Sequence, residues 1–153
     1  METHGPTEDV AAIKALVARQ FGALVWSPAS AAHWDQFQAD FLPEASLYPA
    51  ARPPKRQTVA AFLDRMKNLS HATLTTFNEV VLGANVVVFG NVAVAVAACE
   101  MTENEAEVSR GVEMLLLVKD AGTWRIASQA WDKESAANPI PPTLLARADE
   151  VIE

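Results

Sequence analysis

The chain has 153 residues and a mass of 16.5 kDa, with 50% apolar and 20% charged residues. This size and composition fit one compact domain and exclude an intrinsically disordered chain. Nineteen acidic against twelve basic residues give a net charge of -7, which disfavours nucleic acid as a partner. Cys99 is the single cysteine, so no internal disulfide is expected. Met1 to Ala12 lack a secretory signal pattern, which predicts a cytoplasmic location.

Helical periodicity governs the first part of the chain. Thr7 is expected to cap a helix whose apolar face runs from Val10 to Leu24 and which ends at Ser27-Pro28. Aromatic residues at spacings of three and four from Trp34 to Phe41 predict a short second helix, ending at Leu42-Pro43. Aromatic packing is expected to hold this second helix against the core.

An extended piece around Leu47-Tyr48 and a proline-rich turn precede a third helix. Thr58 is expected to cap that helix, and its apolar residues from Val59 to Met66 are expected to face inward. After His71 the chain is dominated by Val, Thr, Leu and Ile between turn signals, which predicts antiparallel strands. These strands are expected at residues 72–89, 92–102, 106–119 and 123–133, with a bulge at Gly83-Ala84-Asn85 that bends the sheet.

The run from Val80 to Cys99 contains no charge and has the length of a membrane-spanning helix. Its glycines, asparagines and valines favour strands joined by a hairpin at Gly90-Asn91, so no membrane association is expected. The elements together predict an α+β protein with one domain over residues 1–137 and a tail over 138–153. The Thr143 to Glu153 piece of that tail is expected to be peripheral.

The order of these elements and three short patterns resemble the nuclear transport factor 2-like superfamily over about residues 8 to 134. The patterns are the Gly90-Asn91 hairpin, Arg110-Gly111 at the third meander strand, and the run from Lys119 to Asp132. The resemblance implies a cone-shaped, cystatin-like fold, in which three N-terminal helices pack on a strongly bent antiparallel sheet and leave a pocket at the wide end. The superfamily includes ketosteroid isomerases, polyketide cyclases, dehydratases and binding proteins, so this fold does not select a reaction.

The site patterns of two enzyme types in this superfamily are incomplete here. Ketosteroid isomerases have an acidic base just after the short strand, a tyrosine on the first helix and a further acidic hydrogen-bond donor. This chain has Tyr48-Pro49, Gln20-Phe21 and Leu115 at those positions. Scytalone dehydratase has paired histidines beside tyrosines, whereas this chain has three histidines and one tyrosine without that pairing. Neither activity is expected.

Pairing of the last two strands separates two faces of the sheet. A three-residue loop at Asp120-Ala121-Gly122 sets residue 119 opposite 123, and therefore Glu113 opposite Gln129. One face then carries Gly111, Glu113, Leu115, Gln129 and Trp131, and the other carries Arg110, Val112, Met114, Leu116, Trp124, Ile126 and Asp132. Arg110 and Asp132 are expected to form a cross-strand ion pair, or to line the pocket mouth if the two faces are reversed.

The first face is expected to line the pocket. Glu113 is the candidate catalytic residue, because burial raises the pKa of a carboxyl group and suits it to acid-base work. The candidate ligand-binding residues are Tyr48, Gln129, Trp131 and Leu115. Alternatively, Glu113 faces water and merely pairs with Gln129. No metal or other cofactor is expected, because the sequence lacks a histidine pair at metal spacing and a phosphate-binding glycine loop. Cys99 is expected to be buried and inert.

The second face is apolar enough to favour association with another copy of the chain, which predicts a homodimer. The sequence therefore predicts a protein that binds a small, largely apolar molecule between sheet and helices. Cofactor-free isomerase, dehydratase or cyclase chemistry is one interpretation of that pocket. A non-catalytic binding, dimerisation or assembly module of the same fold is the alternative.

Overall fold

A computed structural model describes residues 1–145 of the chain. Its elements are α1 (Thr7–Ala23), α2 (Trp34–Ala39), β1 (Phe41–Tyr48), α3 (Val59–Ser70), β2 (Phe77–Phe89), β3 (Val92–Glu103), β4 (Glu107–Asp120), β5 (Thr123–Lys133) and the 3-10 helix η1 (Pro142–Leu144). This is the α+β class expected from the sequence. Residues 72–76, predicted to open the first long strand, instead form a turn and a short connection before β2.

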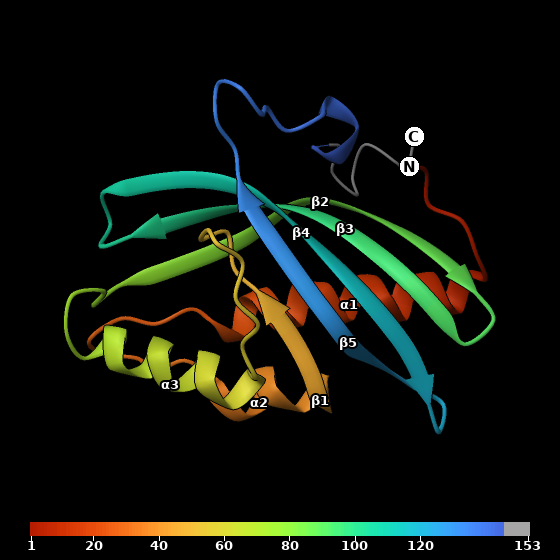
Figure 1. The fold of residues 1–153 in the computed structure, drawn as a ribbon, viewed down its shortest axis with the longest axis horizontal. Helices are drawn as coiled ribbons and strands as arrows, with labels where there is room; N and C mark the ends of the chain where they lie inside the picture. The colour runs from red at the N-terminus through yellow and green to blue at the C-terminus, as the bar shows by residue number, and fades with distance from the viewer. Residues whose placement is uncertain (146–153) are drawn as a thin grey trace.

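The five strands form one mixed sheet in the order β1-β5-β4-β3-β2 (Figure 1). Strands β2 to β5 make the predicted antiparallel meander, whereas β1 pairs in parallel with β5 at one edge. The prediction of an antiparallel sheet alone is therefore wrong, as is a second helix that reaches Phe41. Pro43 explains the difference, because a proline disfavours helical backbone at the residue before it and is tolerated in an edge strand.

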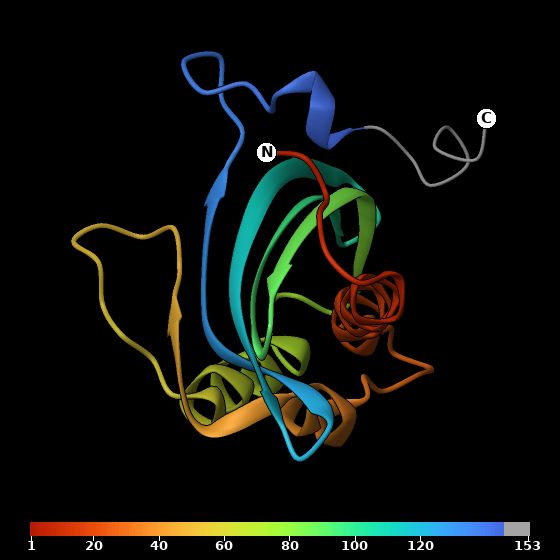
Figure 2. The same ribbon diagram turned by 90° about the vertical axis from the view of Figure 1, so that its right-hand side faces the viewer.

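The sheet bends so that its concave face wraps around α1, as Figure 2 shows. Three irregularities interrupt the strand pairing. One lies between Val81 and Gly83 in β2, one leaves Ala127 of β5 unpaired opposite Leu116 and Leu117 of β4, and one lies between Phe41 and Ser46 in β1. An extra residue in one strand of a pair bends that strand and increases its twist. The first irregularity adjoins the bulge predicted at Gly83-Ala84-Asn85.

Helix α1 lies across the concave face and makes its main contacts with β2 (Figure 2). One stripe of the helix is buried, consisting of Ile13, Leu16, Val17, Gln20, Phe21 and Ala23. Ile13, Leu16, Val17 and Phe21 were predicted to face inward, whereas Ala23 was not. Gln20 is a polar member of this stripe, with no exposed surface.

The first and third helices begin differently. The predicted Thr7 cap is wrong, because Pro6 occupies the N-cap position of α1 and no side chain caps that helix. In α3 the prediction is confirmed, because Thr58 Oγ1 accepts a hydrogen bond of 3.1 Å from the backbone N of Ala61. A threonine in this position satisfies one backbone N–H that would otherwise lack a partner.

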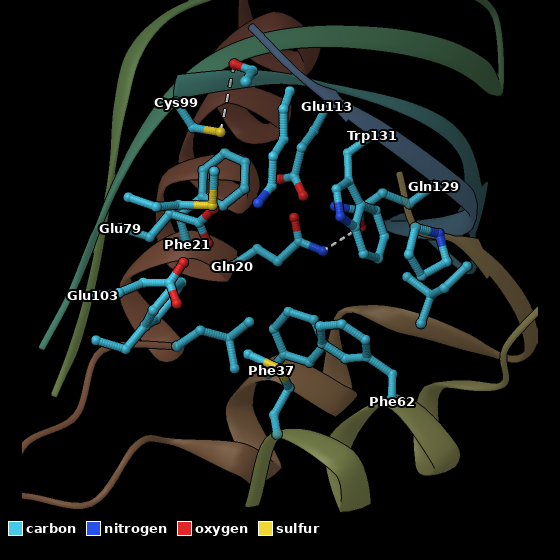
Figure 3. Close-up of a pocket in the computed structure, with 18 of the residues that line it drawn as sticks. Gln20, Phe21, Phe37, Phe62, Glu79, Cys99, Glu103, Glu113, Gln129 and Trp131 are labelled. Carbon is cyan, nitrogen blue, oxygen red and sulfur yellow. Dashed lines mark hydrogen bonds between the residues drawn. The ribbon is translucent and has the colours of Figure 1, made fainter. Parts of the chain in front are cut away.

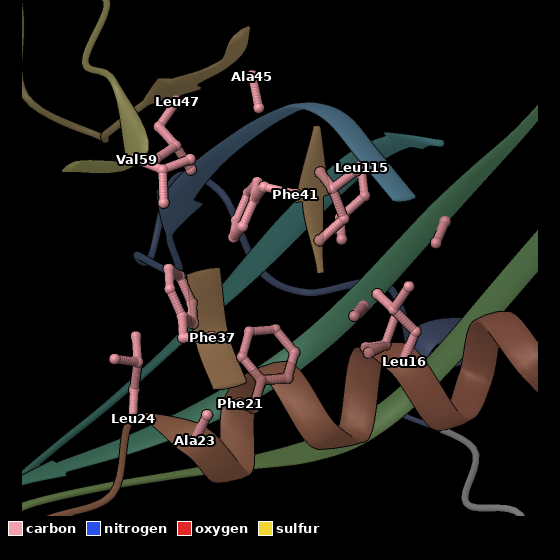
Figure 4. Packing of buried hydrophobic residues seen from close by; sticks show 14 of the residues in the cluster. Leu16, Phe21, Ala23, Leu24, Phe37, Phe41, Ala45, Leu47, Val59 and Leu115 are labelled. Atoms are coloured by element: carbon pink, nitrogen blue, oxygen red, sulfur yellow. The ribbon is translucent and has the colours of Figure 1, made fainter. Parts of the chain in front are cut away.

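Aromatic side chains join α2 and α3 to the sheet at one end of the core, and Figure 4 shows two of them, Phe37 and Phe41. The ring centroids of Phe37 and Phe41 lie 5.1 Å apart, and Phe37 stacks on Phe62 at 5.7 Å. Phe62 in turn meets Trp131 edge-on at 5.6 Å. Through these contacts α2 and α3 pack against β1 and β5.

The uncharged run from Val80 to Cys99 forms most of the β2–β3 hairpin, with its turn at Gly90-Asn91 as predicted. Within residues 1–145, no helix combines the length and the apolar character needed to cross a membrane.

The N-terminal residues extend the sheet beyond its free β2 edge. The backbone N of His4 donates to Val86 O, and the backbone N of Val88 donates to His4 O, each over 2.8 Å. Residue 4 and Val87 are thereby bridged in parallel. The segment around His4 therefore forms hydrogen bonds with backbone groups of β2 that would otherwise be exposed at the edge of the sheet.

The C-terminal segment covers part of the outer, convex face of the sheet (Figure 2). Ile140 and Leu144 are buried there against Ala98, and the carboxylate of Glu134 accepts a hydrogen bond of 2.8 Å from Ile140 N. Residues 146–153, which hold most of the predicted Thr143 to Glu153 piece, lie outside the described residues.

The register between β4 and β5 differs from the prediction. The connection is a two-residue turn, with Asp120 opposite Thr123, and the irregularity then sets Glu113 opposite Trp131. Relative to the predicted pairing with Gln129, the net displacement is two residues, which leaves the direction of each side chain unchanged. Between the turn and the irregularity, the pairing differs from the prediction by one residue, which reverses the face toward which each β5 side chain points. Trp124 and Ile126 therefore lie in the core and not on the outer face as predicted.

Candidate functional site

A cavity of about 310 Å³ opens between the concave face of the sheet and helices α1 and α3 (Figure 3). Its walls are largely aromatic and aliphatic. Its polar or ionisable lining groups within the buried part are Gln20 from α1, Glu79 from β2, Cys99 from β3, Glu113 from β4 and Gln129 from β5. An apolar cavity with a few convergent polar groups is the usual form of a small-molecule site.

Three of the predicted site residues line this cavity. Glu113, Gln129 and Trp131 point into it from β4 and β5 (Figure 3). Glu113 is 8% exposed, so the alternative in which it faces water is wrong.

Two other predicted residues are placed differently. Leu115 shares the face of Glu113 but is buried in the core further along β4, outside the cavity lining. Tyr48 is 37% exposed and does not line the cavity, because strand alternation turns the neighbouring Leu47 inward. The predicted approach of Tyr48 to the pocket is therefore wrong.

The predicted Arg110–Asp132 ion pair is not formed. Arg110 binds Glu100 on β3 with an N···O distance of 2.9 Å, and Asp132 lies 3.7 Å from the Arg52 guanidinium. The β4–β5 displacement explains this, because Asp132 stands opposite Val112. Asp132 is nevertheless one of the residues around the cavity.

Glu79 and Glu113 are both buried carboxyl groups, at 7% and 8% exposure. Burial raises the pKa of Glu79 to about 8, and hydrogen bonding with the Cys99 thiol opposes this rise. Burial also raises the pKa of Glu113 well above its ordinary value, and the nearby Glu79 charge adds to the rise, whereas hydrogen bonding with the Gln129 side chain opposes it. Two acidic groups so close in an apolar site therefore retain protons at a pH where exposed glutamates have lost theirs.

Cys99 lies between the two carboxyl groups, and its thiol contacts Gly111 O at 3.6 Å. Burial and the charges of Glu113 and Glu79 raise the pKa of this thiol. The protonated form is therefore favoured, which agrees with the predicted inert character of Cys99. Its place in the cavity lining is a feature that the sequence interpretation missed.

A pair of amides fixes the floor of the cavity. Gln20 Nε2 donates a hydrogen bond of 2.6 Å to Gln129 Oε1, linking α1 to β5 (Figure 3). Gln20 Oε1 and Glu113 Oε2 are buried and have no hydrogen-bond partner. Buried acceptors without partners are costly, and in a cavity they are the atoms that a ligand can satisfy.

The Glu79 and Glu113 oxygens and the Cys99 sulfur lie within 4.8 Å of one another, close enough to share one metal ion. Such a site would need the thiolate form of Cys99, which the local burial and charges disfavour.

Gln20 and Glu79 were not identified as site residues from the sequence, although a periodic signal marks both. Gln20 is four residues from Leu16 and from Leu24, so it shares their inward helical face. Glu79 is two residues from Phe77 and shares its face of β2. A polar residue at a core position of each pattern is the signal that could have found them.

No protein-family model matches the chain, and no significant match occurs among the curated proteins. Solved structures do match it. A nuclear transport factor 2-like (NTF2-like) protein of unknown function from Pseudomonas putida KT2440 has a TM-score of 0.69 at 11% identity, covering 90% of this chain and 96% of that one. The chain has the NTF2-like fold.

Two further NTF2-like or related structures carry activity names. A proposed dehydratase of the NTF2-like family from Streptomyces avermitilis has a TM-score of 0.68 at 12% identity, covering 86% of this chain and 100% of that one. A proposed aromatic ring hydroxylase from Novosphingobium aromaticivorans has a TM-score of 0.69 at 15% identity, covering 86% and 93%. The TM-scores show a shared fold, and identities this low leave the reaction to be argued from the residues of the cavity.

Proposed function

We propose that this protein binds a small, largely apolar molecule in the cavity and performs cofactor-free acid-base chemistry on it. Glu113 is the proton carrier in this proposal, Glu79 is its partner, and Gln129 orients Glu113. The observation that carries the proposal is the pair of buried carboxyl groups, both with raised pKa, in one aromatic cavity. Pairs of titratable groups with strongly perturbed pKa values are typical of acid-base sites.

The chemistry follows from the protonation of the pair. At neutral pH the two groups hold protons that exposed carboxyls would have released, so one can donate to a carbonyl oxygen or to a leaving hydroxyl group. The other group, once it has released its own proton to solvent, is the carboxylate that removes a proton from carbon. In isomerisation this proton is returned at another carbon, and in dehydration it replaces the proton that leaves with water. Isomerisation and dehydration both need this combination of donor and acceptor, and the name of the Streptomyces avermitilis protein is compatible with the second.

A non-catalytic binding or assembly module is a second candidate, favoured by the exposed apolar side chains on the convex face. Met114 is 59% exposed, Leu116 47% and Val94 39%, on neighbouring strands β4 and β3. We propose that this face joins two copies of the chain, since contiguous exposed apolar surface on a sheet is typical of an interface. Val112, which was predicted to belong to this face, is half-buried beside the C-terminal segment.

Exchange of the α-hydrogens of 2-tetralone in deuterated buffer tests the catalytic proposal, because this apolar ketone reports proton transfer at carbon without a defined natural substrate. We expect the wild-type chain to accelerate exchange and Glu113→Gln to lose ~10²–10⁴-fold of that acceleration, since only the ionisable group is removed. Glu107→Gln is the matched control, because Glu107 lies on the same strand and is exposed. Equal acceleration by both variants, or none in the wild type despite binding of the ketone, contradicts acid-base catalysis by Glu113.

A further inference from the structure

The buried end of the cavity collects hydrogen-bond acceptors that the protein leaves unused. Gln20 Oε1 and Glu113 Oε2 have no partner, and the two side chains are 0% and 8% exposed. The Glu79 carboxyl lies beside them, with an oxygen within 4.8 Å of one from Glu113. Figure 3 shows the Gln20 side chain directed from α1 toward Glu113 and Gln129.

The hydrogen bonds of the two amides hold Gln20 in this orientation. Its Nε2 donates to Gln129 Oε1 at 2.6 Å, and among residues 1–145 its oxygen has no hydrogen-bond partner. Gln129 Oε1 already accepts this bond, so the acceptors left without a partner are Gln20 Oε1 and Glu113 Oε2. The missing group is therefore a donor, and it must serve several acceptors at once.

Within residues 1–145, no cationic side chain pairs with either of the two carboxyl groups. The basic side chains around the cavity are Arg65 and Lys133, and both are exposed. With no cation beside them, the two groups keep their protons, and a bound cationic group would stabilise one of them as a carboxylate.

The remaining walls suit an organic body more than a bare ion. Phe21, Phe37, Phe62, Phe77 and Trp131 line the cavity. Aromatic faces attract ammonium groups and also bury hydrocarbon. A volume of about 310 Å³ is far larger than an ion needs, and the favoured thiol form of Cys99 makes it a poor metal ligand.

We propose that the ligand is a small aromatic or aliphatic primary amine, whose ammonium group is bound by Gln20 Oε1, Glu113 and Glu79 while its apolar body fills the aromatic part of the cavity. An alkylammonium group supplies three N–H donors and one positive charge, which matches three acceptors and one carboxylate. The second carboxyl keeps its proton. This inference rests on the proposed function and narrows its substrate class, since the proton that remains is the one available for acid-base chemistry.

Calorimetric titration at neutral pH with three ligands of matched size tests this inference. These are 2-phenylethylamine, 2-phenylethanol and phenylacetate, added to protein first dialysed against a chelator. We expect the amine to bind about tenfold or more tightly than the alcohol, and phenylacetate to bind most weakly, because only the ammonium satisfies the acceptors and the charge. Glu79→Gln and Gln20→Met are expected to remove most of the preference for the amine, whereas the exposed Glu107→Gln is expected to retain it.

Each contrary outcome has a distinct meaning. Equal binding of alcohol and amine overturns the ammonium site but leaves an apolar binding cavity, and with it the proposed function. Failure of all three to bind contradicts both proposals. Cobalt(II) that binds with the visible absorption of a thiolate complex, and that excludes the amine, overturns the inference in favour of a metal site formed by Glu79, Cys99 and Glu113.

Discussion

The buried carboxyl pair predicts that the protein loses stability as the pH rises. An unfolded glutamate has a pKa near 4.5, whereas Glu79 in the folded chain has one raised to about 8. Between these values the folded state binds more protons than the unfolded state, so the free energy of unfolding falls with rising pH. At about 1.4 kcal/mol per pH unit for one proton, Glu79 alone accounts for a loss on the order of 5 kcal/mol across this window.

Urea unfolding followed by tryptophan fluorescence between pH 5 and pH 8.5 measures this loss. With a urea dependence of ~1–3 kcal/mol per molar, a fall of about 1.4 kcal/mol moves the midpoint down by roughly 0.5–1.4 M per pH unit. Asp9 does not interfere, because hydrogen bonds from Lys119 and Trp124 lower its pKa below 3.8, outside the window.

Removing the ionisable groups should flatten this pH dependence. Glu79→Gln is expected to weaken the slope, because Glu113 remains buried, and the double variant with Glu113→Gln is expected to abolish most of it. Glu107→Gln, which removes an exposed carboxyl from β4, should leave the slope unchanged. A wild-type midpoint that stays constant or rises between pH 5 and pH 8 would refute the reasoning, because the pair would then be ionised and compensated in the folded state.

Three further changes test the fold and the proposed interface. Gly111→Ala should destabilise the protein by ~1–3 kcal/mol in urea unfolding, because an added Cβ would stand 2.6 Å from the backbone oxygen of Asp132; an unchanged midpoint would show that β5 can yield there. Thr58→Ala should cost about 1 kcal/mol by removing the α3 cap, and a loss below about 0.3 kcal/mol in the same assay would contradict that role. Met114→Glu should convert the proposed homodimer to a monomer in light scattering, because an unpaired charge buried in an interface costs several kcal/mol; a monomeric wild type would rule the dimer out.

The sequence predicted the helices and the cavity-lining faces of the strands because their periodicity is strong. Leu16 and Val17 in α1 and Phe62 in α3 repeat at helical spacing and are buried as predicted. The inward direction of Glu113 and Gln129 was predicted from a wrong register, whose error of two residues preserves the face. The turn length and the irregularity beside Leu117 depend on backbone geometry, which a residue pattern does not specify.

The less predictable part of the site comes from contacts between distant segments. Glu79 and Glu113 come together only because β3 lies between their strands and brings Cys99 alongside both. Gln20 meets Gln129 across 109 positions of sequence. These contacts depend on how strongly the sheet bends around α1. The strand pattern predicts that the sheet bends but does not predict by how much. The short strand around Leu47-Tyr48 was predicted, but its parallel pairing was missed for a related reason, since its partner β5 lies far along the chain.

The pairing of His4 with β2 covers part of the exposed edge of the sheet, where a strand of another molecule could otherwise bind. Without His4, the backbone O of Val86 and the backbone N of Val88 would lack these hydrogen-bond partners, at the edge of a valine-rich strand. Such an edge can recruit a strand from another molecule and start a growing stack of sheets. We therefore expect removal of residues 1–5 to expose this edge and to favour edge-to-edge association of separate molecules.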